Sequence, residues 1–584
     1  MLNINVKKHF FDVTIIGAGG SGLAAAIFAA KRGLRVALVS KVHPLQSHTV
    51  AAQGGINASL GNITEDDWRW HAYDTIKASD WLADQDSVEE MCRQAPEVIA
   101  MLSELGVEFD QNQAGKIDQK IYGGQSTLFG KGTFAYRACF VKDRTGHSII
   151  HKLYDEAIKC GVVFFNYNFA IDLLFNDECC HGVISLDIEQ GILNAILSAN
   201  TIIATGGGSQ VYLTSTSSSI CTGDGGGLVA RIGVPLQDME FVQFHPTAIP
   251  LFGVLITEAA RSAGGKLVNS LGEQFMKRYA PKFNDLAARD VVARAIATEI
   301  KMGRGCGDKK DYIHLDLRHL SEEQIKEKLP TVFENCEKFL KVNPSKELIP
   351  VVPAAHYMMG GIPTDSNCQV VKFDGNDRKI EGLYAIGEAA CISVHGAGRL
   401  GCNSLLDLIV FAKKVAGLVT SKDHDFNADE ILQSISAKIN KILSNNKQIY
   451  TDIRDKLKLV MSHNVGVFRN KNDLDLAYKE VLMLEEEYYS SGVSDISLNW
   501  NIGLIGYFEL ENMLILAKAI IGSAIWRKES RGAHWRVEFQ DPNPEFLVHS
   551  ICYPFDHNHE NIYLRKVRLA KNNVDFYQPV KRNY

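Results

Sequence analysis

A glycine-rich hexapeptide near the N-terminus restricts the possible folds of this chain most strongly. Gly17-Ala18-Gly19-Gly20-Ser21-Gly22 follows the apolar run 12–16 and precedes an alanine-rich segment, 23–32, and a second apolar run, 34–40. These segments read as strand, turn, helix and strand. In such a βαβ unit, Gly17 permits the tight turn, Gly19 lets the backbone approach a pyrophosphate, and Gly22 lets helix and strand pack closely. The sequence therefore predicts an α/β fold with a Rossmann-like, dinucleotide-binding domain.

The second strand of this unit ends in Ser40-Lys41. Dinucleotide-binding domains usually have an acidic residue at this point, where its carboxylate binds a ribose. The Ser40 hydroxyl can bind the ribose instead, although it discriminates less well. We therefore place both residues among the expected cofactor-binding residues.

Two later segments repeat the pattern of a strand that runs into a glycine turn. They are Thr201 to Gly208 and Leu383 to Ala389. We expect both to belong to the first domain, which is then discontinuous and consists of residues 1–245 and 353–425. The intervening residues, 246–352, are predicted to be an inserted α+β domain.

The C-terminal part has a different pattern. Apolar residues such as Ile435, Ile439 and Ile442 recur at helical spacing, which predicts a helical bundle over residues 426–540. Residues 541–584 are richer in Pro, Asn and aromatic residues and have no helical period. They are predicted to form a small C-terminal domain.

Composition excludes several classes of function. A formal net charge of -6 gives no electrostatic case for nucleic-acid binding. The 12 cysteines include no Cys-x-x-Cys pair, so no metal or iron–sulfur site is expected and the thiols are expected to be reduced. No stretch reads as a membrane span, and the first strand starts too early for a cleaved leader. Any membrane association is expected to come through a partner.

A histidine follows the glycine loop closely, in the segment Ser47-His48-Thr49-Val50-Ala51-Ala52-Gln53-Gly54-Gly55. The reactive ring of a bound dinucleotide can reach a side chain at this place. Neutral imidazole is a nucleophile, and near pH 7 much of it is neutral. If the cofactor is a flavin, His48 is a candidate for covalent attachment. The alternative is a histidine that only hydrogen-bonds the cofactor or the loop.

Blocks of sequence from residue 12 to the C-terminus resemble the flavoprotein subunits of succinate dehydrogenase and fumarate reductase. A single block could match by chance, but their common order and spacing make chance a poor explanation. The blocks are GAGGSG (17–22), SHTVAAQGG (47–55), DRTGH (143–147), TGDG (222–225), QFHPT (243–247), ITEAAR (256–261), ARDVVAR (288–294), HYMMGGIPTD (356–365), GEAACISVHGAGRLGCNSLLD (387–407) and ESRGAH (529–534).

The resemblance implies a specific chemistry. Succinate has no activated C–H bond, so its oxidation needs a hydride acceptor of high potential, a base, and groups that bind two carboxylates. The family carries FAD on a histidine, here His48, and transfers the proton through an arginine, here Arg289, with Glu258 and Arg261 as a relay. From the residues alone, a substrate-binding arginine or an ion pair with Asp290 is the simpler interpretation of Arg289, because a guanidinium is a poor base.

The resemblance also implies a clamp for a small dicarboxylate such as succinate or fumarate. Arg399 can bind one carboxylate through two parallel hydrogen bonds, and the other members donate single hydrogen bonds. The inserted domain 246–352 would be a capping domain whose closure excludes water. The expected substrate-binding residues are His245, Thr257, Glu258, His356 and Arg399.

The remaining predicted residues bind FAD. Asp224 and Glu388 would bind ribose or ribityl hydroxyls, with a helix cap as the alternative. Ser404 and Leu405 would start a helix whose N–H groups point at the flavin. The full set is Gly17, Ala18, Gly19, Gly20, Ser21, Gly22, Ser40, Lys41, Ser47, His48, Thr49, Gln53, Gly54, Gly55, Asp224, Glu388, Ser404 and Leu405.

A few positions depart from the family pattern. Gln46 replaces an arginine before the flavin histidine, and Tyr122 replaces a phenylalanine that packs on the substrate. Ser262 and Ala263 replace a glycine and a glutamate, and Cys402 replaces a glycine near the flavin. None of these changes removes a catalytic group, so activity remains the expectation.

Gln53 bears on the direction of electron flow. Succinate dehydrogenases generally have glutamine here, whereas fumarate reductases have glutamate, whose charge would lower the flavin potential. Succinate oxidation is therefore favoured over fumarate reduction. L-Aspartate oxidase, which generally lacks the flavin histidine, and an inactive scaffold subunit, which predicts loss of clamp residues, are weaker alternatives.

The resemblance implies partners as well. The family's flavoprotein passes electrons to an iron–sulfur subunit docked on membrane-anchor subunits, which reduce quinone. We therefore expect a peripheral location on the cytoplasmic face of a bacterial inner membrane, with a processed organellar form as the alternative.

Overall fold

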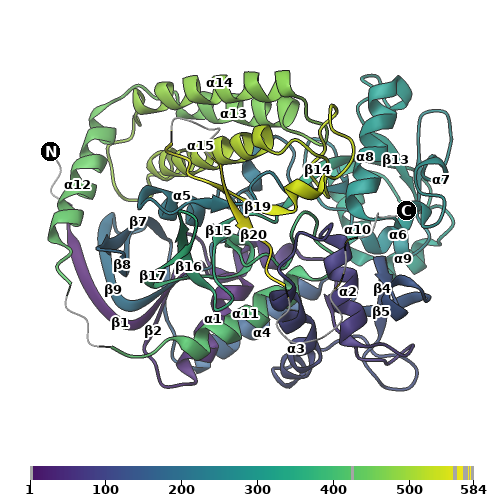
Figure 1. The fold of residues 1–584 in the computed structure, drawn as a ribbon, viewed down its shortest axis with the longest axis horizontal. Coiled ribbons are helices and arrows are strands. Elements are labelled where there is room, and N and C mark those ends of the chain that lie inside the picture. The colour runs from purple at the N-terminus through teal and green to yellow at the C-terminus, as the bar shows by residue number, and fades with distance from the viewer. Residues whose placement is uncertain (1–3, 423–425, 557–561, 570–576, 578, 580–584) are drawn as a thin grey trace.

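A computed structural model describes residues 4–422, 426–556 and 562–569, together with residues 577 and 579 (Figure 1). The predicted domain boundary at residue 425 and the end of the predicted domain 541–584 lie outside the described residues. The described chain is mixed α/β with a helical C-terminal part, as the sequence predicts. The exact division into domains stays a prediction.

The main sheet joins strands from distant parts of the sequence. Its members are β1 (Val6–Ile16), β2 (Val36–Ser40), β6 (Val163–Asn166), β7 (Asn168–Asn176), β8 (Cys179–Asp187), β9 (Ile192–Ile203), β16 (Gln369–Phe373) and β17 (Asp377–Ala385). Their order is β16-β17-β8-β9-β1-β2-β6, with β7 paired to β8. β1 is parallel to β2 and β9, and β9 is parallel to β17. The three glycine turns therefore follow strands of one sheet.

Two element boundaries near the N-terminus differ from expectation. β1 begins at Val6 rather than at residue 12, because its pairing with β9 extends back to the pair Val6 and Leu193. Helix α1 (Gly20–Ala30) begins inside the glycine motif rather than at residue 23, directly after Gly19, whose backbone is extended. The glycine loop is therefore short, and its last residues are already helical.

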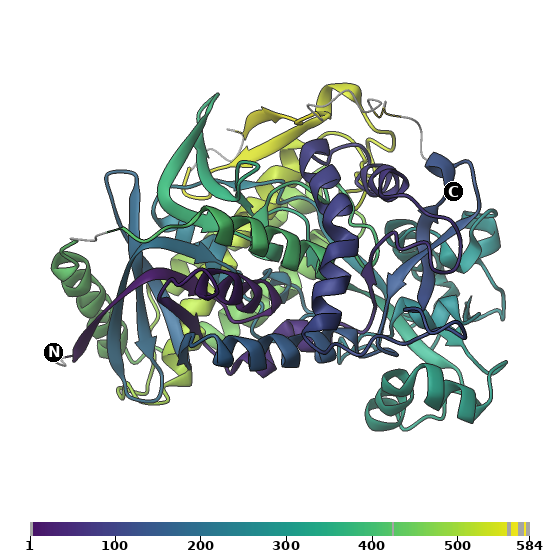
Figure 2. The ribbon, with the colours of Figure 1, turned by 90° about the horizontal axis from the view of Figure 1, so that it is seen from below.

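Helices cover one face of the sheet (Figure 2). α1 packs against α11 and α4, and α11 packs against α3. Apolar side chains such as Leu23, Ile27, Leu406 and Phe411 are buried between them. These helices are α2 (Trp68–Ala78), α3 (Gln85–Glu104), α4 (Thr145–Lys159) and α11 (Ser404–Leu418).

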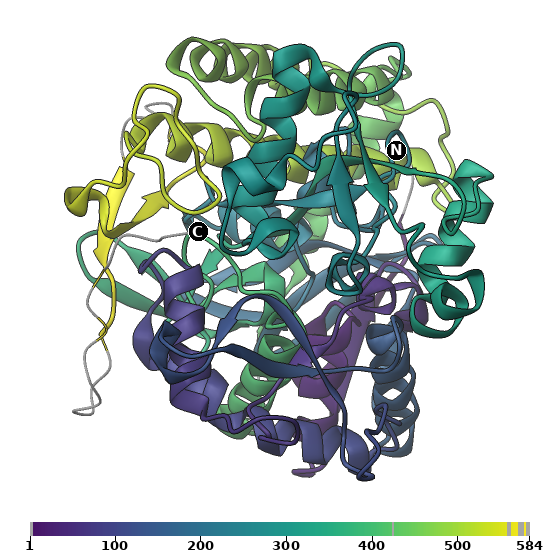
Figure 3. The ribbon, with the colours of Figure 1, turned by 90° about the vertical axis from the view of Figure 1, so that its right-hand side faces the viewer.

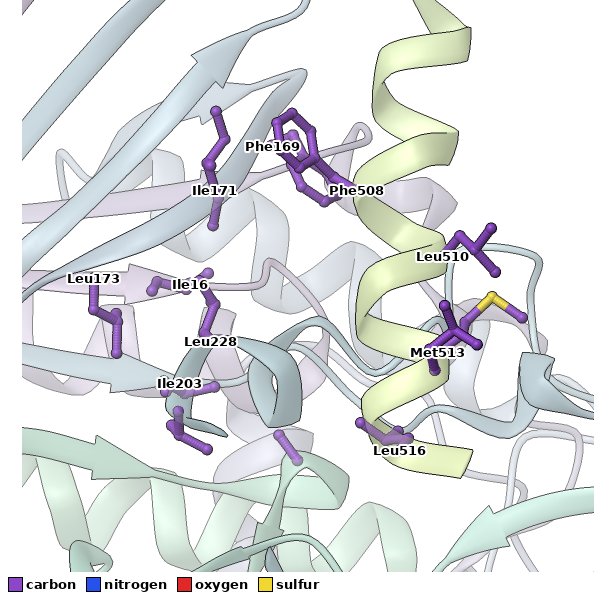
Figure 4. Packing of buried hydrophobic residues seen from close by; sticks show 14 of the residues in the cluster. Ile16, Phe169, Ile171, Leu173, Ile203, Leu228, Phe508, Leu510, Met513 and Leu516 are labelled. Carbon is purple, nitrogen blue, oxygen red and sulfur yellow. The ribbon is translucent and has the colours of Figure 1, made fainter. Parts of the chain in front are cut away.

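The C-terminal helices pack on the other side. They are α12 (Asp429–Ser444), α13 (Tyr450–Asn464), α14 (Lys471–Tyr489) and α15 (Ile502–Trp526), and α15 contacts α5 (Asp224–Arg231). Phe508 of α15 stacks on Phe169 with ring centroids 6.0 Å apart (Figure 4). Leu516 of α15 packs against Gly208 and Gly223. The helical bundle and the sheet thus share one core. Within the described ranges, no helix is long and apolar enough to cross a membrane.

An antiparallel sheet with short helices lies beside the main sheet (Figure 3). Its strand order is β11-β14-β13-β12. The predicted limits of the insertion, residues 246 and 352, fall inside β11 and β14, which pair with each other. The elements are β11 (Val242–Ala248), α6 (Glu258–Ser262), β12 (Lys266–Val268), α7 (Met276–Tyr279), α8 (Arg289–Glu299), β13 (Ile313–Asp316), α9 (Glu322–Lys328), α10 (Pro330–Asn335) and β14 (Ile349–Met358).

Smaller sheets complete the fold. One is β3 (Ile56–Asn57), β5 (Phe134–Cys139) and β4 (Gln119–Ser126), and another pairs β15 (Ile362–Pro363) with β18 (Ala390–Cys391). The C-terminal segment forms β19 (Val548–Cys552) and β20 (Ile562–Lys566), which join β10 (Leu236–Gln237). The described strands after residue 541 are therefore anchored to the rest through β10. The 12 cysteines are all free of disulfides.

Candidate active site

A cavity of about 790 Å³ runs along the carboxyl ends of β1, β2 and β9. Ligand sites in proteins commonly have this size, and open α/β sheets bind ligands at this edge. Most of the predicted residues line it. They are Gly17, Ala18, Gly19, Gly20, Ser21, Ser40, Lys41, Ser47, His48, Thr49, Gln53, Asp224, His356, Glu388, Arg399, Ser404 and Leu405.

The glycine loop has the close contacts that its residue types predict. Gly17 has φ +107°, and a Cβ there would lie 2.3 Å from the carbonyl oxygen of Ala204. A Cβ on Gly22 would lie 1.8 Å from the Gly17 oxygen, so the first turn of α1 can pack on the loop only with glycine. The loop thereby points the N-terminus of α1 at the cavity, which suits a phosphate.

His48 lies in a 3₁₀ turn, His48–Ala51, on the cavity wall. Its Nδ1 accepts a hydrogen bond from the backbone N–H of Ser218 at 3.2 Å. Burial, assisted by the positive charge of Arg399, lowers the pKa of His48 to about 4. The ring is therefore neutral near pH 7, and Nε2 is the nitrogen outside this bond.

Lys41 and Asp224 bind each other as well as lining the cavity. Lys41 Nζ lies 2.8 Å from Asp224 Oδ2 and 2.7 Å from Glu509 Oε1 of α15. Glu388 accepts a hydrogen bond from the Met358 backbone N–H at 3.1 Å, and burial raises the pKa of Glu388 to about 7. Asp224 and Glu388 are thus both fixed in place on the cavity wall.

Arg289 begins α8 and faces a buried carboxylate. Its Nε donates to Glu258 Oε2 at 3.0 Å, and Arg261 Nη2 lies 3.7 Å from the same oxygen. The backbone N–H of Gly123 donates to the other carboxylate oxygen at 2.9 Å. Burial alone would raise the pKa of Glu258, but the two arginines lower it below its ordinary value. The carboxylate is therefore ionised and can accept a proton.

Arg399 is held from several sides. Its Nη1 donates to Ser404 Oγ at 2.8 Å, and its guanidinium lies 4.3 Å from the centre of the Tyr357 ring. Burial and the nearby Arg289 lower the pKa of Arg399 to about 10, so it stays charged near pH 7. Ser404 begins α11, as expected, and its hydroxyl also accepts the hydrogen bond from Arg399.

Gln243 is a site residue that the sequence did not single out. Its Oε1 accepts from Arg289 Nη1 and from Arg399 Nη2, both at 3.2 Å, and its Nε2 donates to the Arg399 carbonyl at 2.9 Å. The available signal was its place at the start of the block QFHPT, two residues before His245. A neutral amide thus separates the two positive charges.

The two predicted histidines lie together. The ring centroids of His245 and His356 are 5.0 Å apart. Thr247 engages Nδ1 of His245, and the Thr216 hydroxyl lies 2.7 Å from Nδ1 of His356. Burial lowers the pKa of both histidines well below the ordinary value. The charge of Arg289 lowers the pKa of His245 further, and the neighbouring His245 lowers that of His356. Both rings are neutral, with Nε2 left outside these bonds.

Some predicted residues lie behind the cavity wall rather than on it. His245, Thr257, Glu258 and Arg289 do not line the cavity. His245 contacts the wall residue His356, Arg289 is joined to the wall residue Arg399 through Gln243, and Glu258 binds Arg289. Thr257 caps α6 through its hydroxyl oxygen. Gly22, Gly54 and Gly55 are also absent from the wall. Contacts of the first group with a ligand therefore remain predictions.

Two of the departures from the family pattern, Tyr122 and Cys402, lie close together beside Gly54. Tyr122 is buried, and its hydroxyl would lie 3.6 Å from a Cβ on Gly54. Cys402 Sγ accepts from the Gly55 N–H at 3.3 Å. A Cβ on Gly55 would lie 2.6 Å from the carbonyl oxygen of Cys139, so Gly55 serves the close approach of this segment to β5. Gln46, by contrast, is exposed at the cavity mouth.

Comparison with known proteins adds to this geometry. Residues 12–405 match the FAD binding domain family, and residues 454–584 match the fumarate reductase flavoprotein C-terminal family. The chain is 46% identical to the succinate dehydrogenase flavoprotein subunit of Rickettsia conorii, over 99% of both chains. It is 48% identical to the mitochondrial succinate dehydrogenase flavoprotein subunit of Oryza sativa subsp. japonica, over 99% of this chain and 91% of the relative. A structure of E. coli quinol fumarate reductase is similar, with a TM-score of 0.91, 32% identity and 99% of both chains covered.

Proposed function

Because this chain belongs to the family of succinate dehydrogenase and fumarate reductase flavoprotein subunits, we propose that it oxidises succinate to fumarate with FAD. The observation that carries the proposal is that His48, His356 and Arg399 line one cavity, with His245 in contact with His356 and Arg289 joined to Arg399 through Gln243.

The cavity residues fit FAD. The glycine loop directs the N-terminus of α1 at the cavity, where a pyrophosphate is stabilised. In the described part of the chain, Ser47 Oγ and Gln53 Oε1 are buried without a hydrogen-bond partner, and both residues line the cavity. When bound, FAD supplies the hydride acceptor. The predicted FAD-binding residues would hold its phosphates, ribose and flavin ring.

We further propose that His48 is the covalent attachment point. Its neutral ring and the engagement of Nδ1 by Ser218 support a bond through Nε2. A covalent bond would also fix the flavin ring beside the dicarboxylate site. After digestion of the protein, mass spectrometry should therefore detect the peptide that contains His48 with FAD attached to it.

The substrate end supports a clamp with a proton relay. Arg399 would bind one carboxylate, while His245, His356 and Thr257 would donate hydrogen bonds to the substrate. Fixing both ends positions the central C–C bond, which supplies much of the rate. Glu258 takes a proton from Arg289 Nε, which lets that guanidine accept the substrate's proton, and Arg261 stabilises the relay.

Gln53 supports succinate oxidation over fumarate reduction as the direction. Its Nε2 donates to the Leu255 carbonyl at 3.2 Å, so a neutral amide lies on the cavity wall. A glutamate here would add a negative charge and lower the flavin potential. The partners we propose are the iron–sulfur and membrane-anchor subunits, which would hold this subunit peripherally on the cytoplasmic face of a bacterial inner membrane.

The assembled complex tests these points together. We expect faster succinate oxidation with a quinone acceptor than fumarate reduction with a low-potential donor. The opposite ratio would identify a fumarate reductase. A complex that holds FAD but oxidises no succinate, with quinone or with a dye, would support the inactive scaffold instead.

A further inference from the structure

The block 529–534 lies outside the cavity, yet it contacts the helix that carries Arg289. The carbonyl oxygen of Gly532 accepts a hydrogen bond from Arg294 Nη1 at 3.0 Å. Arg294 belongs to α8, which begins at Arg289, and its Nη2 donates to Asp290 at 2.9 Å within the same helix. One arginine thus ties the first turns of α8 to the backbone at Gly532.

The same glycine also contacts the loop that carries Arg399. Gly532 has φ +52°, and a Cβ on it would lie 2.2 Å from the carbonyl oxygen of Ala397. That oxygen accepts a hydrogen bond from the N–H of Ala533 at 2.8 Å. Ala397 precedes Arg399 by two residues. The backbone at Gly532 therefore lies directly against the Arg399 loop, at a distance that only glycine permits.

Buried charges hold this block itself in place. Arg531 donates to both carboxylate oxygens of Glu529, at 2.8 and 2.9 Å, and to the carbonyl of Asp80 at 2.8 Å. The N–H of Gly532 donates to the Asp80 carboxylate at 3.0 Å. Arg531, Glu529 and Asp80 are all buried. Breaking such buried ion pairs is costly, so the block is a fixed support.

We infer that Arg294 and Gly532 are positioning residues that set the spacing of Arg289 and Arg399. The inference rests on the proposed function and adds a bridge from the C-terminal segment to both guanidiniums. The Arg294 hydrogen bond fixes the helix of the proton-transfer group, whereas the close approach at Gly532 fixes the loop of the carboxylate-binding group.

The two contacts predict different kinetic consequences. Arg294→Met keeps the aliphatic stem but loses the bond to the Gly532 carbonyl, so α8 can shift and Arg289 leaves its place at Glu258. Gly532→Ala forces the Ala397 carbonyl away, which displaces Arg399. The first change slows proton transfer, and the second weakens dicarboxylate binding.

The test uses the assembled complex with Arg294→Met, Arg294→Lys and Gly532→Ala. Arg318→Met, an exposed arginine, and Gly417→Ala, whose Cβ would meet nothing within 4 Å, are matched controls. Each complex is measured for FAD content, for kcat with succinate, and for the Kd of malonate from the flavin absorbance. Malonate has a single carbon between its carboxylates, so it binds without being oxidised.

We expect Arg294→Met to lower kcat by about 10-fold or more, since a small misplacement of a reacting group is costly. Its malonate Kd should stay within about 2-fold and its FAD content unchanged, while Arg294→Lys recovers part of kcat. Gly532→Ala should raise the malonate Kd by about 10-fold or more, because it displaces the carboxylate-binding arginine. The two control variants should match the wild type.

Wild-type kcat in Arg294→Met overturns the inference. Parallel loss of FAD, thermal stability and kcat in both Arg294 variants also overturns it, because that pattern indicates a structural role alone. If the Gly532→Ala protein does not accumulate in cells, the kcat values of the two Arg294 variants decide whether the inference holds. A wild-type complex that binds malonate but oxidises no succinate would instead refute the proposed function.

Discussion

Arg289 and Arg399 share one hydrogen-bond acceptor. Each donates to the side-chain oxygen of Gln243 over 3.2 Å. Two cations that bind the same atom in a buried site repel each other strongly, and the oxygen of the amide dipole between them reduces that repulsion. The shared acceptor also fixes the separation between the group that moves a proton and the group that binds a carboxylate.

Replacing Gln243 should therefore impair catalysis without removing the cofactor. In Gln243→Leu the two guanidiniums lose their common acceptor, and we expect kcat with succinate to fall about 10-fold or more. Gln243→Glu keeps the acceptor but adds a charge that competes with the substrate carboxylate, so KM should rise. Steady-state kinetics on the assembled complex measure both, with FAD content as the control. Unchanged kcat in Gln243→Leu would contradict the positioning role.

Removing the relay carboxylate should affect turnover more than binding. Glu258→Gln keeps the hydrogen bond from Gly123 but cannot take a proton from Arg289 Nε. We expect kcat to fall by about 100-fold or more, the usual range for a lost acid–base group. Glu327→Gln, an exposed change in α9, is the control. A relay that bypasses Glu258 would leave kcat near the wild-type value.

His48→Ser tests the attachment of FAD separately from its binding. We expect the variant to hold FAD that is released on denaturation, because the glycine loop and the rest of the cavity remain. Succinate oxidation should fall about 10-fold or more, since the hydride step loses an oriented acceptor. Filtration of the denatured complex and succinate kinetics give the two measurements. FAD that stays bound to denatured His48→Ser protein would place the attachment elsewhere.

The stability of the C-terminal sheet should depend on pH. His549 is buried between Asp238 and Asp84, with nitrogen–oxygen distances of 2.7 and 3.2 Å. Burial alone would lower the pKa of His549, but the two carboxylates raise it from 6.5 to about 9. The folded-state pKa is the higher one, so the stabilisation is full below pH 6.5 and is lost as the pH rises through 9.

The size of this effect is on the order of 3 kcal/mol, from the difference between the two pKa values. His549→Gln removes the titration, so the wild type should lose its advantage in Tm over the variant between pH 6.5 and 9.5. Thermal unfolding of both proteins across that range provides the measurement. A Tm difference that does not change with pH would show that His549 is not protonated in the folded chain.

The sequence predicts what is local and what the family shares. The glycine loop and the helical C-terminal part follow from residue pattern, because helix periodicity and turn chemistry are local properties. The helix that starts at Ser404 follows from the resemblance. The proximity of His245 to His356 follows only from the resemblance, since more than a hundred residues separate them.

Other features exist only in the folded chain. Lys41 was expected at a ribose, and the structure pairs it with Asp224 and with Glu509 of a distant helix. Gln243 begins the block QFHPT, but its role becomes visible only where Arg289 and Arg399 both donate to it. β1 extends to Val6 because β9 is available as a neighbour. Long-range pairing decides each of these cases, and a single sequence carries little information about it.

The pairing of β17 with β9 has a consequence for the order of events during synthesis. The ribosome releases the first glycine loop early, but Glu388 and Leu405, which complete the cavity wall, follow several hundred residues later. Domains fold as units while the chain emerges, and contacts of high sequence separation form slowly. A complete cofactor site therefore cannot exist until the chain beyond α11 has left the ribosome. FAD can therefore load only onto chains, nascent or released, that already carry all three glycine turns.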